Sequence, residues 1–306
     1  MNLLVTGAWS SAKEHIKTIE QMGHVVCFIQ HEKEKLPCSY EWIEGVIGNG
    51  IFMFHPIEKF INLKYIQLTS AGYDRVPIDY VKEHKIEIHN AKSVYSIPMA
   101  EFAFAGALQL YKKMQYFAEN QKRCCWEKHR GLLELNGKTV CIVGCGDVGT
   151  ECAKRFAAFG CNVIGVNRTV REVECFQKIY ELNKIDEGLV HADIIILTIA
   201  ETKQTIKLIG EERLKKLKKT AIIVNIARGA IVDMNALLGH LDEIGGAVLD
   251  VFEEEPLREN SPLWEMENVI ITPHNSFVGE GNEKRLLEVI QGNLNHGFKG
   301  EMDGVL

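Results

Sequence analysis

Short apolar runs alternate along the chain with stretches in which apolar residues recur at helical spacing. The first pattern is typical of buried β-strands, and the second of amphipathic helices. Strands that alternate with helices predict parallel sheets packed between layers of helices. We expect strands near residues 3–6, 24–29, 45–47, 64–69, 86–89, 138–143, 162–166, 193–198, 221–225, 246–250 and 268–271. We expect helices near residues 11–22, 77–84, 99–121, 147–159, 211–217, 234–243 and 281–297.

This pattern runs in two series, which a long helical stretch after Pro98 separates. A length of 306 residues also fits two domains. The predicted fold class is therefore α/β, with two doubly wound parallel-sheet domains and a cleft between them. Ligands of such sheets bind beyond the carboxyl ends of the strands, so the candidate site residues are sought there.

The charge balance argues against two classes of partner. The chain has 35 Lys and Arg against 41 Asp and Glu, a formal net charge of -6. Such a balance gives no positive footprint for nucleic acid or for an anionic membrane. Its apolar runs all fall short of the ~20 residues that span a bilayer, and the start of the chain lacks the basic region of a signal sequence. We expect a cytoplasmic protein that binds neither nucleic acid nor membrane.

The nine cysteines do not predict a metal site. None of them forms a Cys-x-x-Cys unit with a histidine at zinc spacing. We interpret them as reduced thiols, and we interpret Cys145, which lies inside a glycine-rich loop, as a small filler residue. No metal is expected.

The glycine-rich loop Gly144-Cys-Gly-Asp-Val-Gly149 stands between an expected strand and an expected helix. Gly144 permits the tight turn, Gly146 lets backbone N–H groups approach a pyrophosphate, and Gly149 lets helix and strand pack closely. Because the loop has this context and a second strand follows, it predicts a dinucleotide site. The expected contacts in the loop come from Gly144, Gly146, Asp147, Val148 and Gly149.

The next strand ends in Asn167-Arg168-Thr169. Enzymes that prefer NAD usually have Asp or Glu at this place, where the carboxylate binds the ribose 2′-hydroxyl. Here Arg168 can pair with a 2′-phosphate and Thr169 can hydrogen-bond to it, and no acidic residue is present to repel it. We predict that NADP(H) is preferred and that NAD(H) is possible.

Three further motifs carry the groups needed to reduce a 2-keto acid. Arg228 lies in Asn225-Ile-Ala-Arg-Gly229 and suits a substrate carboxylate, because a guanidinium offers a planar pair of donors. His274 lies in Thr-Pro-His and suits proton transfer near neutral pH. A carboxylate from the acidic run Glu253–Glu255 can orient the imidazole. Spacing alone does not choose among these three glutamates.

With these motifs in place, the chain resembles the D-2-hydroxyacid dehydrogenase family over nearly its whole length. The resemblance is carried by the glycine loop and by the motifs at 225–229, 250–256 and 272–274. Thr69-Ser-Ala-Gly-Tyr-Asp-Arg75 looks like the family's substrate loop, and Pro98-Met-Ala-Glu101 looks like its hinge. Two stretches depart from the family pattern and put the local pocket shape in doubt, Ile199–Thr202 and Asn275–Gly279.

The resemblance implies a split architecture. A flavodoxin-like substrate domain would take residues 1–98 plus 276–306, and a Rossmann cofactor domain would take residues 99–275. It also implies a homodimer, built largely through the cofactor domains, with a contribution from the helix after Pro98. The substrate would be a small 2-keto acid, reduced to the D-2-hydroxy acid.

The same resemblance assigns roles to the motif residues. Because it precedes a proline, Glu255 is chosen as the partner of His274, the general acid. Arg228 would bind the substrate carboxylate and touch the C2 oxygen. On the cofactor side we expect Ala227 and Asp250, the latter at a strand end, where it bonds the nicotinamide carboxamide or else caps a turn.

The other wall of the substrate site is expected from loops in the first third of the chain. Ser70, Ala71 and Gly72 follow a strand, and their N–H groups can form a nest for the carboxylate. Asn49, which follows another strand, is a further candidate. Arg75 is interpreted as one half of a structural ion pair. Three aromatic residues are candidates for shaping the side-chain pocket, namely Tyr73, Tyr95 and Trp264.

Three alternatives to the hypothesis of a 2-keto acid reductase stay open. The first is a catalytically silent sensor or corepressor that keeps the dehydrogenase fold and binds NAD(P)H. The second is a formate dehydrogenase, which would have glutamine in place of Glu255. The third is a reductase for a phosphorylated substrate, for which the chain offers no phosphate-binding cluster apart from Arg75.

Overall fold

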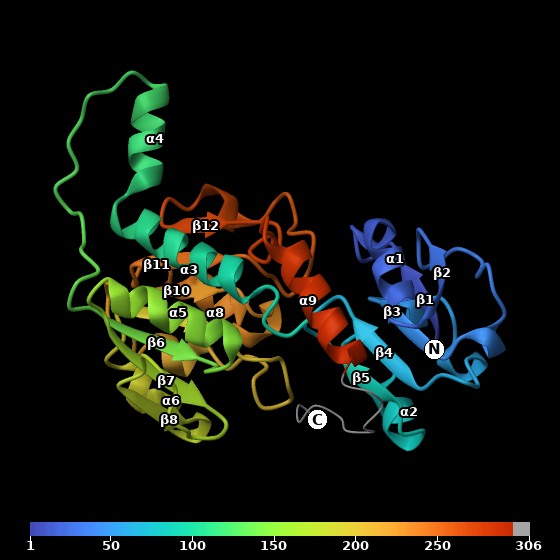
Figure 1. Ribbon diagram of the computed structural model, residues 1–306. Helices are drawn as coiled ribbons and strands as arrows, with labels where there is room; N and C mark the ends of the chain where they lie inside the picture. The colour runs from blue at the N-terminus through green and yellow to red at the C-terminus, as the bar shows by residue number, and fades with distance from the viewer. Residues whose placement is uncertain (296–306) are drawn as a thin grey trace. The chain divides into compact units, whose positions relative to one another are not determined.

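The computed structural model describes residues 1–295 and divides into two compact units (Figure 1). Unit 1 is Met1–Tyr95 together with the segment from Gly279, and unit 2 is Ser96–Val278. The first break differs from the expected one after residue 98 because the helix that follows begins at Ser96. The expected extension of the substrate domain from 296 to 306 lies outside the described residues.

Unit 1 contains a five-stranded sheet in which every described pair of neighbouring strands is parallel. The strand order is β2-β1-β3-β4-β5, the flavodoxin-like order. Its strands are β1 (Asn2–Thr6), β2 (Val25–Ile29), β3 (Gly45–Gly48), β4 (Tyr65–Leu68) and β5 (Glu87–His89). Its helices are α1 (Ala12–Gln21), α2 (Ile78–Glu83) and α9 (Asn282–Asn295), with short 3-10 turns at Tyr40–Trp42, Ile51–Met53 and Ile57–Lys59.

Both faces of the central strands of this sheet are buried, which explains the apolar residues of β1 and β3. Leu3 and Val5 of β1 pack on one face with Ile290 of α9. Leu4, between them in sequence, points to the opposite face and packs with Val81 of α2. Alternate residues of one strand thus serve two cores, as the two-residue period of a strand requires.

Unit 2 contains a seven-stranded parallel sheet in the order β12-β11-β10-β9-β6-β7-β8. The strand order reverses between β6 and β9, as in the Rossmann fold. Its strands are β6 (Thr139–Val143), β7 (Asn162–Asn167), β8 (Lys178–Glu181), β9 (Ile194–Leu197), β10 (Ile222–Asn225), β11 (Gly246–Leu249) and β12 (Val269–Ile271). Its helices are α3 (Ser96–Tyr111), α4 (Met114–Lys122), α5 (Asp147–Ala158), α6 (Ile185–Leu189), α7 (Glu211–Leu214) and α8 (Met234–His240), with 3-10 turns at Leu182–Lys184, Gly229–Ile231 and Pro262–Glu265.

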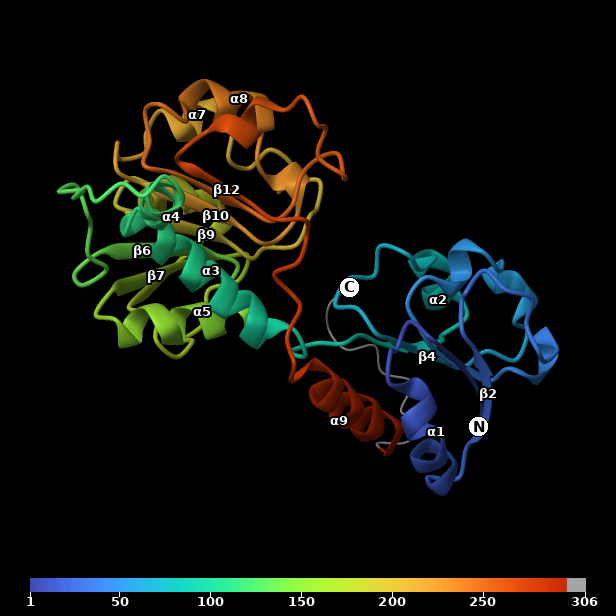
Figure 2. The same cartoon turned by 90° about the horizontal axis from the view of Figure 1, so that it is seen from above.

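Helices cover both faces of the larger sheet (Figure 2). On one face α3 and α5 pack through Ala103 and Phe156 against residues such as Ile142. Gly106 lets α3 approach the sheet closely, because a Cβ there would lie 2.7 Å from Val248 Cγ1. On the other face α6, α7 and α8 enclose a second core. The predicted pair of doubly wound α/β domains is therefore confirmed.

Three local expectations were wrong or incomplete. The helix expected at 99–121 is two helices, because Lys113 has a left-handed backbone with φ of 51°. The strand β8 and the helix α6 were not predicted. The turn Thr6–Ala8 predicts that Ser10 or Ser11 caps the helix that follows, but Ser11 makes no side-chain cap bond to α1 and its hydroxyl donates to Glu283 of α9.

The helices were also examined for a segment that could span a membrane, which the sequence does not predict. Within residues 1–295, no helix combines the length and the apolar character that crossing a membrane requires.

Candidate active site

The glycine loop adopts the turn that its spacing predicts. Gly144 has φ of +106°, and a Cβ there would lie 2.7 Å from the backbone N of Ile199. A Cβ on Gly149 would lie 2.0 Å from Gly144 O, so the start of α5 packs directly on the turn. Beside Gly146, in contrast, nothing lies within 4 Å of the Cβ position. Open space at the N-terminus of a twelve-residue helix fits the approach of a pyrophosphate.

Cys145, inside this loop, is a filler and not a reactive thiol. Its side chain is fully buried, and its Sγ lies 3.7 Å from Val166 O. Burial raises the pKa of this thiol to about 12. A Cβ on Gly165 would lie 2.4 Å from the same sulfur, so the small residue of the neighbouring strand makes room for it.

The end of β7 exposes the residues expected to select the cofactor. Arg168 and Thr169 are exposed, and Asn167 is half-buried. The Asn167 side chain donates through Nδ2 to Thr169 O at 3.1 Å, which ties it to its own turn. Arg168 therefore extends from a turn that carries no carboxylate at these three positions.

The loop after β10 presents Arg228. Buried Asn225 shapes this loop, accepting a hydrogen bond from Ala227 N at 3.1 Å and donating to Arg228 O at 3.0 Å. Arg228 is half-buried, and its guanidinium donates to Ala227 O at 2.8 Å. A Cβ on Gly229 would lie 1.9 Å from the carbonyl carbon of Phe252. The loops after β10 and β11 thus touch, and only glycine fits between them.

Glu255 and His274 meet at the carboxyl ends of β11 and β12. Oε2 of Glu255 lies 2.9 Å from Nδ1 of His274, and Oε1 accepts from Phe252 N at 3.0 Å. The two side chains are 38% and 42% exposed, so the pair remains open to a ligand. The neighbours of Glu255 are exposed, and Glu254 pairs with Arg258 instead. The expected choice of Glu255 as partner of the histidine agrees with this contact.

The turn that carries His274 is held by Asp250. His274 has φ of 51°, a left-handed conformation that side chains rarely adopt. Its N–H donates to Asp250 O at 2.8 Å. The fully buried Asp250 carboxylate accepts from Thr272 Oγ1 at 2.6 Å, and from the backbone N of Asn275 and Ser276 at 2.7 and 3.0 Å. Of the two expected roles of Asp250, the turn cap is thus present, while contact with the cofactor stays a prediction.

In unit 1 the loop after β4 presents backbone N–H groups. Its carbonyls are anchored: Ser70 O accepts from Ala91 N at 2.9 Å, and Ala71 O accepts from Asn90 Nδ2 at 2.7 Å. The Ser70 hydroxyl donates to Gly72 O at 3.1 Å. Within residues 1–295, the N–H groups of these three loop residues have no hydrogen-bond acceptor. The role of these N–H groups as a nest for the substrate carboxylate stays a prediction.

The loop after β3 differs, because its N–H groups are occupied. Asn49 N and Gly50 N both donate to the carboxylate of Glu32, each at 2.7 Å. Sequence analysis missed Glu32; the signal available was a carboxylate just beyond the carboxyl end of β2. The ion pair expected for Arg75 is wrong, since this exposed side chain pairs with no carboxylate within the described part of the chain.

Two of the aromatic residues expected to shape the side-chain pocket, Tyr95 and Trp264, make hydrogen bonds to different loops. Tyr95 donates its hydroxyl to Thr69 O, beside the nest, and Trp264 donates to Arg258 O at 2.9 Å. Phe277, not predicted, contacts the ring of His274 edge-on at 6.1 Å between centroids. Metal-binding clusters of His, Cys, Asp or Glu are not found in residues 1–295.

Comparison with known proteins agrees with this geometry. Residues 104–276 match the family model of the D-isomer specific 2-hydroxyacid dehydrogenase NAD binding domain. A glyoxylate reductase of Thermofilum pendens is 35% identical over 253 residues, which cover 80% of this chain and 75% of the relative. A D-3-phosphoglycerate dehydrogenase of Methanocaldococcus jannaschii is 33% identical over 95% of this chain but only 56% of its own length.

Solved structures lead to the same family. A D-isomer specific 2-hydroxyacid dehydrogenase from Xanthobacter autotrophicus Py2, in complex with NADPH and MES, has a TM-score of 0.77 and 25% identity, with 96% of this chain and 94% of that chain covered. The matched family model spans the glycine loop, Arg228, Glu255 and His274. The chain belongs to the D-isomer specific 2-hydroxyacid dehydrogenase family, whose members are nicotinamide-dependent oxidoreductases.

Proposed function

We propose that this chain reduces a small 2-keto acid to the D-2-hydroxy acid and that it uses NADPH in preference to NADH. The observation that carries the proposal is the Glu255–His274 contact beside Arg228, on the ends of three neighbouring strands. A formate dehydrogenase needs no proton donor, so the carboxylate–imidazole pair favours a keto acid.

The Glu255–His274 contact supports an orientation in which Nε2 faces the substrate. An ionised carboxylate can only accept a hydrogen bond, so Nδ1 of His274 carries a hydrogen toward Glu255. Nε2 is then the nitrogen that gives its proton to the substrate oxygen.

Arg228 has a different task. Its planar guanidinium binds the substrate carboxylate and holds the C2 carbonyl in place. Anchoring the guanidinium to Ala227 O limits its motion, so less order has to be imposed when substrate binds. The turn Gly144–Gly149 would hold the pyrophosphate of a nicotinamide cofactor, which would supply the hydride for C2 of the keto acid.

The cofactor preference rests on the end of β7. A 2′-phosphate would meet the exposed Arg168 and Thr169 and no carboxylate from Asn167. A charge-assisted bond to arginine is stronger than one between neutral groups. NADPH should therefore bind more tightly than NADH.

A panel of 2-keto acids tests the function. Glyoxylate, pyruvate, hydroxypyruvate and phenylpyruvate are offered with NADPH or NADH, and the product is resolved on a chiral column. We expect turnover of at least one acid, a D-product where a stereocentre forms, and a higher kcat/KM with NADPH. Tight NADPH binding without any turnover would instead support the sensor or corepressor, and an L-product would contradict the proposal.

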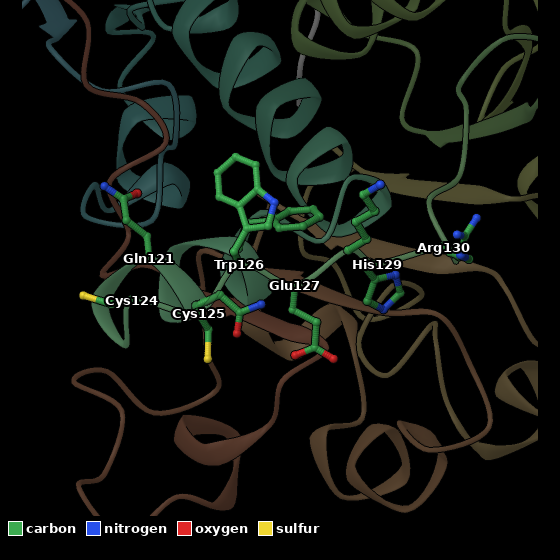
Figure 3. A pocket seen from close by; sticks show the side chains of 10 residues that line it. Gln121, Cys124, Cys125, Trp126, Glu127, His129 and Arg130 are labelled. Carbon is green, nitrogen blue, oxygen red and sulfur yellow. The ribbon is translucent and has the colours of Figure 1, made fainter.

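We also propose that the chain is a homodimer that uses an arm of unit 2. The arm consists of α4 and the loop that follows it to residue 134, and Figure 1 shows it standing away from the rest of the unit. It encloses a hollow of about 850 Å³, and Figure 3 shows the side chains around it. Trp126 in this loop is 100% exposed. A tryptophan left fully in water is costly in an isolated chain and typical of an interface anchor.

Light scattering after gel filtration tests the arm. The unmodified chain should have twice the mass of one chain, about 69 kDa from 34.5 kDa. Trp126→Glu should shift the protein toward the monomer, whereas Phe159→Glu, at an exposed phenylalanine on another part of the unit, should not. A monomeric unmodified chain would refute the dimer.

A further inference from the structure

The carboxylate of Glu32 fills a backbone anion nest at the carboxyl edge of the unit 1 sheet. Oε1 accepts from Asn49 N at 2.7 Å and from Thr6 Oγ1 at 2.9 Å, while Oε2 accepts from Gly50 N at 2.7 Å. Two consecutive N–H groups that point at one carboxylate form an arrangement that binds anions. Here the anion is a side chain of the protein itself.

The nest is built around this carboxylate. The backbone carbonyl of Glu32 lies 3.0 Å from Nε2 of the buried His55, whose Nδ1 lies 2.9 Å from Tyr40 Oη. Gly48 leaves the space that the carboxylate needs, because a Cβ there would lie 2.7 Å from Oε1. The glutamate is thus fixed through both its side chain and its backbone.

The neighbouring loop provides the contrast. The strands β3 and β4 are adjacent and parallel, so Asn49–Gly50 and Ser70–Gly72 leave the sheet at the same edge. The N–H groups of Ser70–Gly72 have no acceptor within residues 1–295, while those of Asn49–Gly50 are taken by Glu32. One nest is open to a ligand anion, and the other is closed.

We propose that Glu32 is a specificity-determining residue that limits the substrate to one anionic group. This inference rests on the proposed keto-acid reduction. The nest at Ser70–Gly72 binds the substrate carboxylate. At Asn49–Gly50, the Glu32 carboxylate occupies the second nest, so a phosphate or a second carboxylate on the substrate side chain cannot bind there. Its negative charge also repels such a group. Exposed Arg75 runs past the closed nest, with Cδ 3.5 Å from the Cβ position of Gly50, and would attract an anion if Glu32 were absent.

Anion binding tests the nest without any use of catalysis. Glu32→Ala removes the internal anion, and the matched control is Glu34→Gln, at an exposed glutamate two residues further along the same turn. Melting temperatures are measured against sodium acetate, sodium formate and inorganic phosphate at constant ionic strength. We expect these anions to stabilise Glu32→Ala in a saturable way and to a larger extent than the unmodified chain or the control, in which only the open nest and Arg228 are available to them. Identical responses of all three proteins would overturn the proposal.

Substrate discrimination tests the specificity. The ratio of kcat/KM for glyoxylate to that for 2-oxoglutarate, and to that for 3-phosphohydroxypyruvate, should fall by about tenfold or more in Glu32→Ala, because the like-charge repulsion is removed. The dissociation constant for NADPH, followed by its fluorescence, should not change. Unchanged ratios would also overturn the proposal, even if acetate binds.

Glu32→Gln covers the case in which the alanine variant does not fold. The amide keeps the volume but loses the charge and turns an NH₂ group toward the nest. Relative to the unmodified chain, we expect a higher KM for glyoxylate and a fall in the two ratios, and unchanged ratios would overturn the proposal. If the unmodified chain reduces no keto acid while Glu32→Ala gains acetate binding, the proposed function fails and the closed nest stands.

Discussion

The two units present their candidate site groups in opposite ways. Unit 2 uses side chains on the ends of three adjacent strands, and each is held by a backbone contact: Arg228 by Ala227 O, Glu255 by Phe252 N, and His274 by Asp250 O. Unit 1 offers backbone N–H groups, which have no acceptor at Ser70–Gly72 among residues 1–295 and are bound by Glu32 at Asn49–Gly50. Chemistry by side chains depends on residue identity, while binding by N–H groups depends on backbone geometry. The two regions should therefore respond to substitution very differently.

Loss of the side-chain groups should have the largest effect. His274→Ala removes the proton donor and Arg228→Ala removes the carboxylate clamp, so each should lower kcat/KM for the keto acid by about 1,000-fold. His191→Ala, at an exposed histidine between α6 and β9, is the matched control and should keep the unmodified rate. Steady-state kinetics with a melting curve for each variant provide the measurement. Near-normal turnover in either variant would remove that residue from the mechanism.

A smaller effect is expected from the partner of the histidine. Glu255→Gln keeps an acceptor for the Nδ1 hydrogen of His274 but replaces a charge-assisted hydrogen bond with a weaker neutral one. The imidazole is then held less firmly, so kcat/KM should fall by about 10- to 100-fold in steady-state kinetics. Glu254→Gln, whose carboxylate pairs with Arg258, is the control. An unchanged kcat/KM in Glu255→Gln would show that the carboxylate charge has no part in the reaction.

Substitutions at the end of β7 should change the selectivity between NADPH and NADH and leave the hydride transfer itself unaffected. Arg168→Ala should lower kcat/KM with NADPH by about tenfold and leave the value with NADH nearly unchanged, because NADH lacks the 2′-phosphate. The ratio of the two values is the measurement. Arg258→Ala, at an arginine beyond the β11 loop, should leave the ratio unchanged. Equal losses of kcat/KM with both cofactors would show that Arg168 does not bind the 2′-phosphate.

The contrast between side-chain groups and backbone N–H groups also explains which features could be predicted from the sequence. The strands of both sheets apart from β8 were predictable, because buried parallel strands are apolar runs, whereas β8 is a partly exposed edge strand. The glycine turn was predictable because only glycine fits at Gly144 and Gly149. The break between α3 and α4 at Lys113 could not be predicted, because no glycine or proline lies there. Glu255 could be chosen over its neighbours only through the family resemblance. Glu32 was missed because a carboxylate that binds backbone N–H groups has no spacing signature in the sequence.

The smallest effects are expected where binding is by backbone. Ser70→Ala should change the KM for the keto acid by no more than about twofold, because its hydroxyl donates to Gly72 O and not to a ligand. Ala71→Pro, one residue along at an exposed position, removes an N–H group from the open nest and should raise the KM severalfold with little change in the KM for NADPH. Matched melting curves would separate this loss from unfolding of the loop. A larger effect from the serine than from the proline would mean that unit 1 binds its ligand by side chains after all, and the contrast between the two units would not hold.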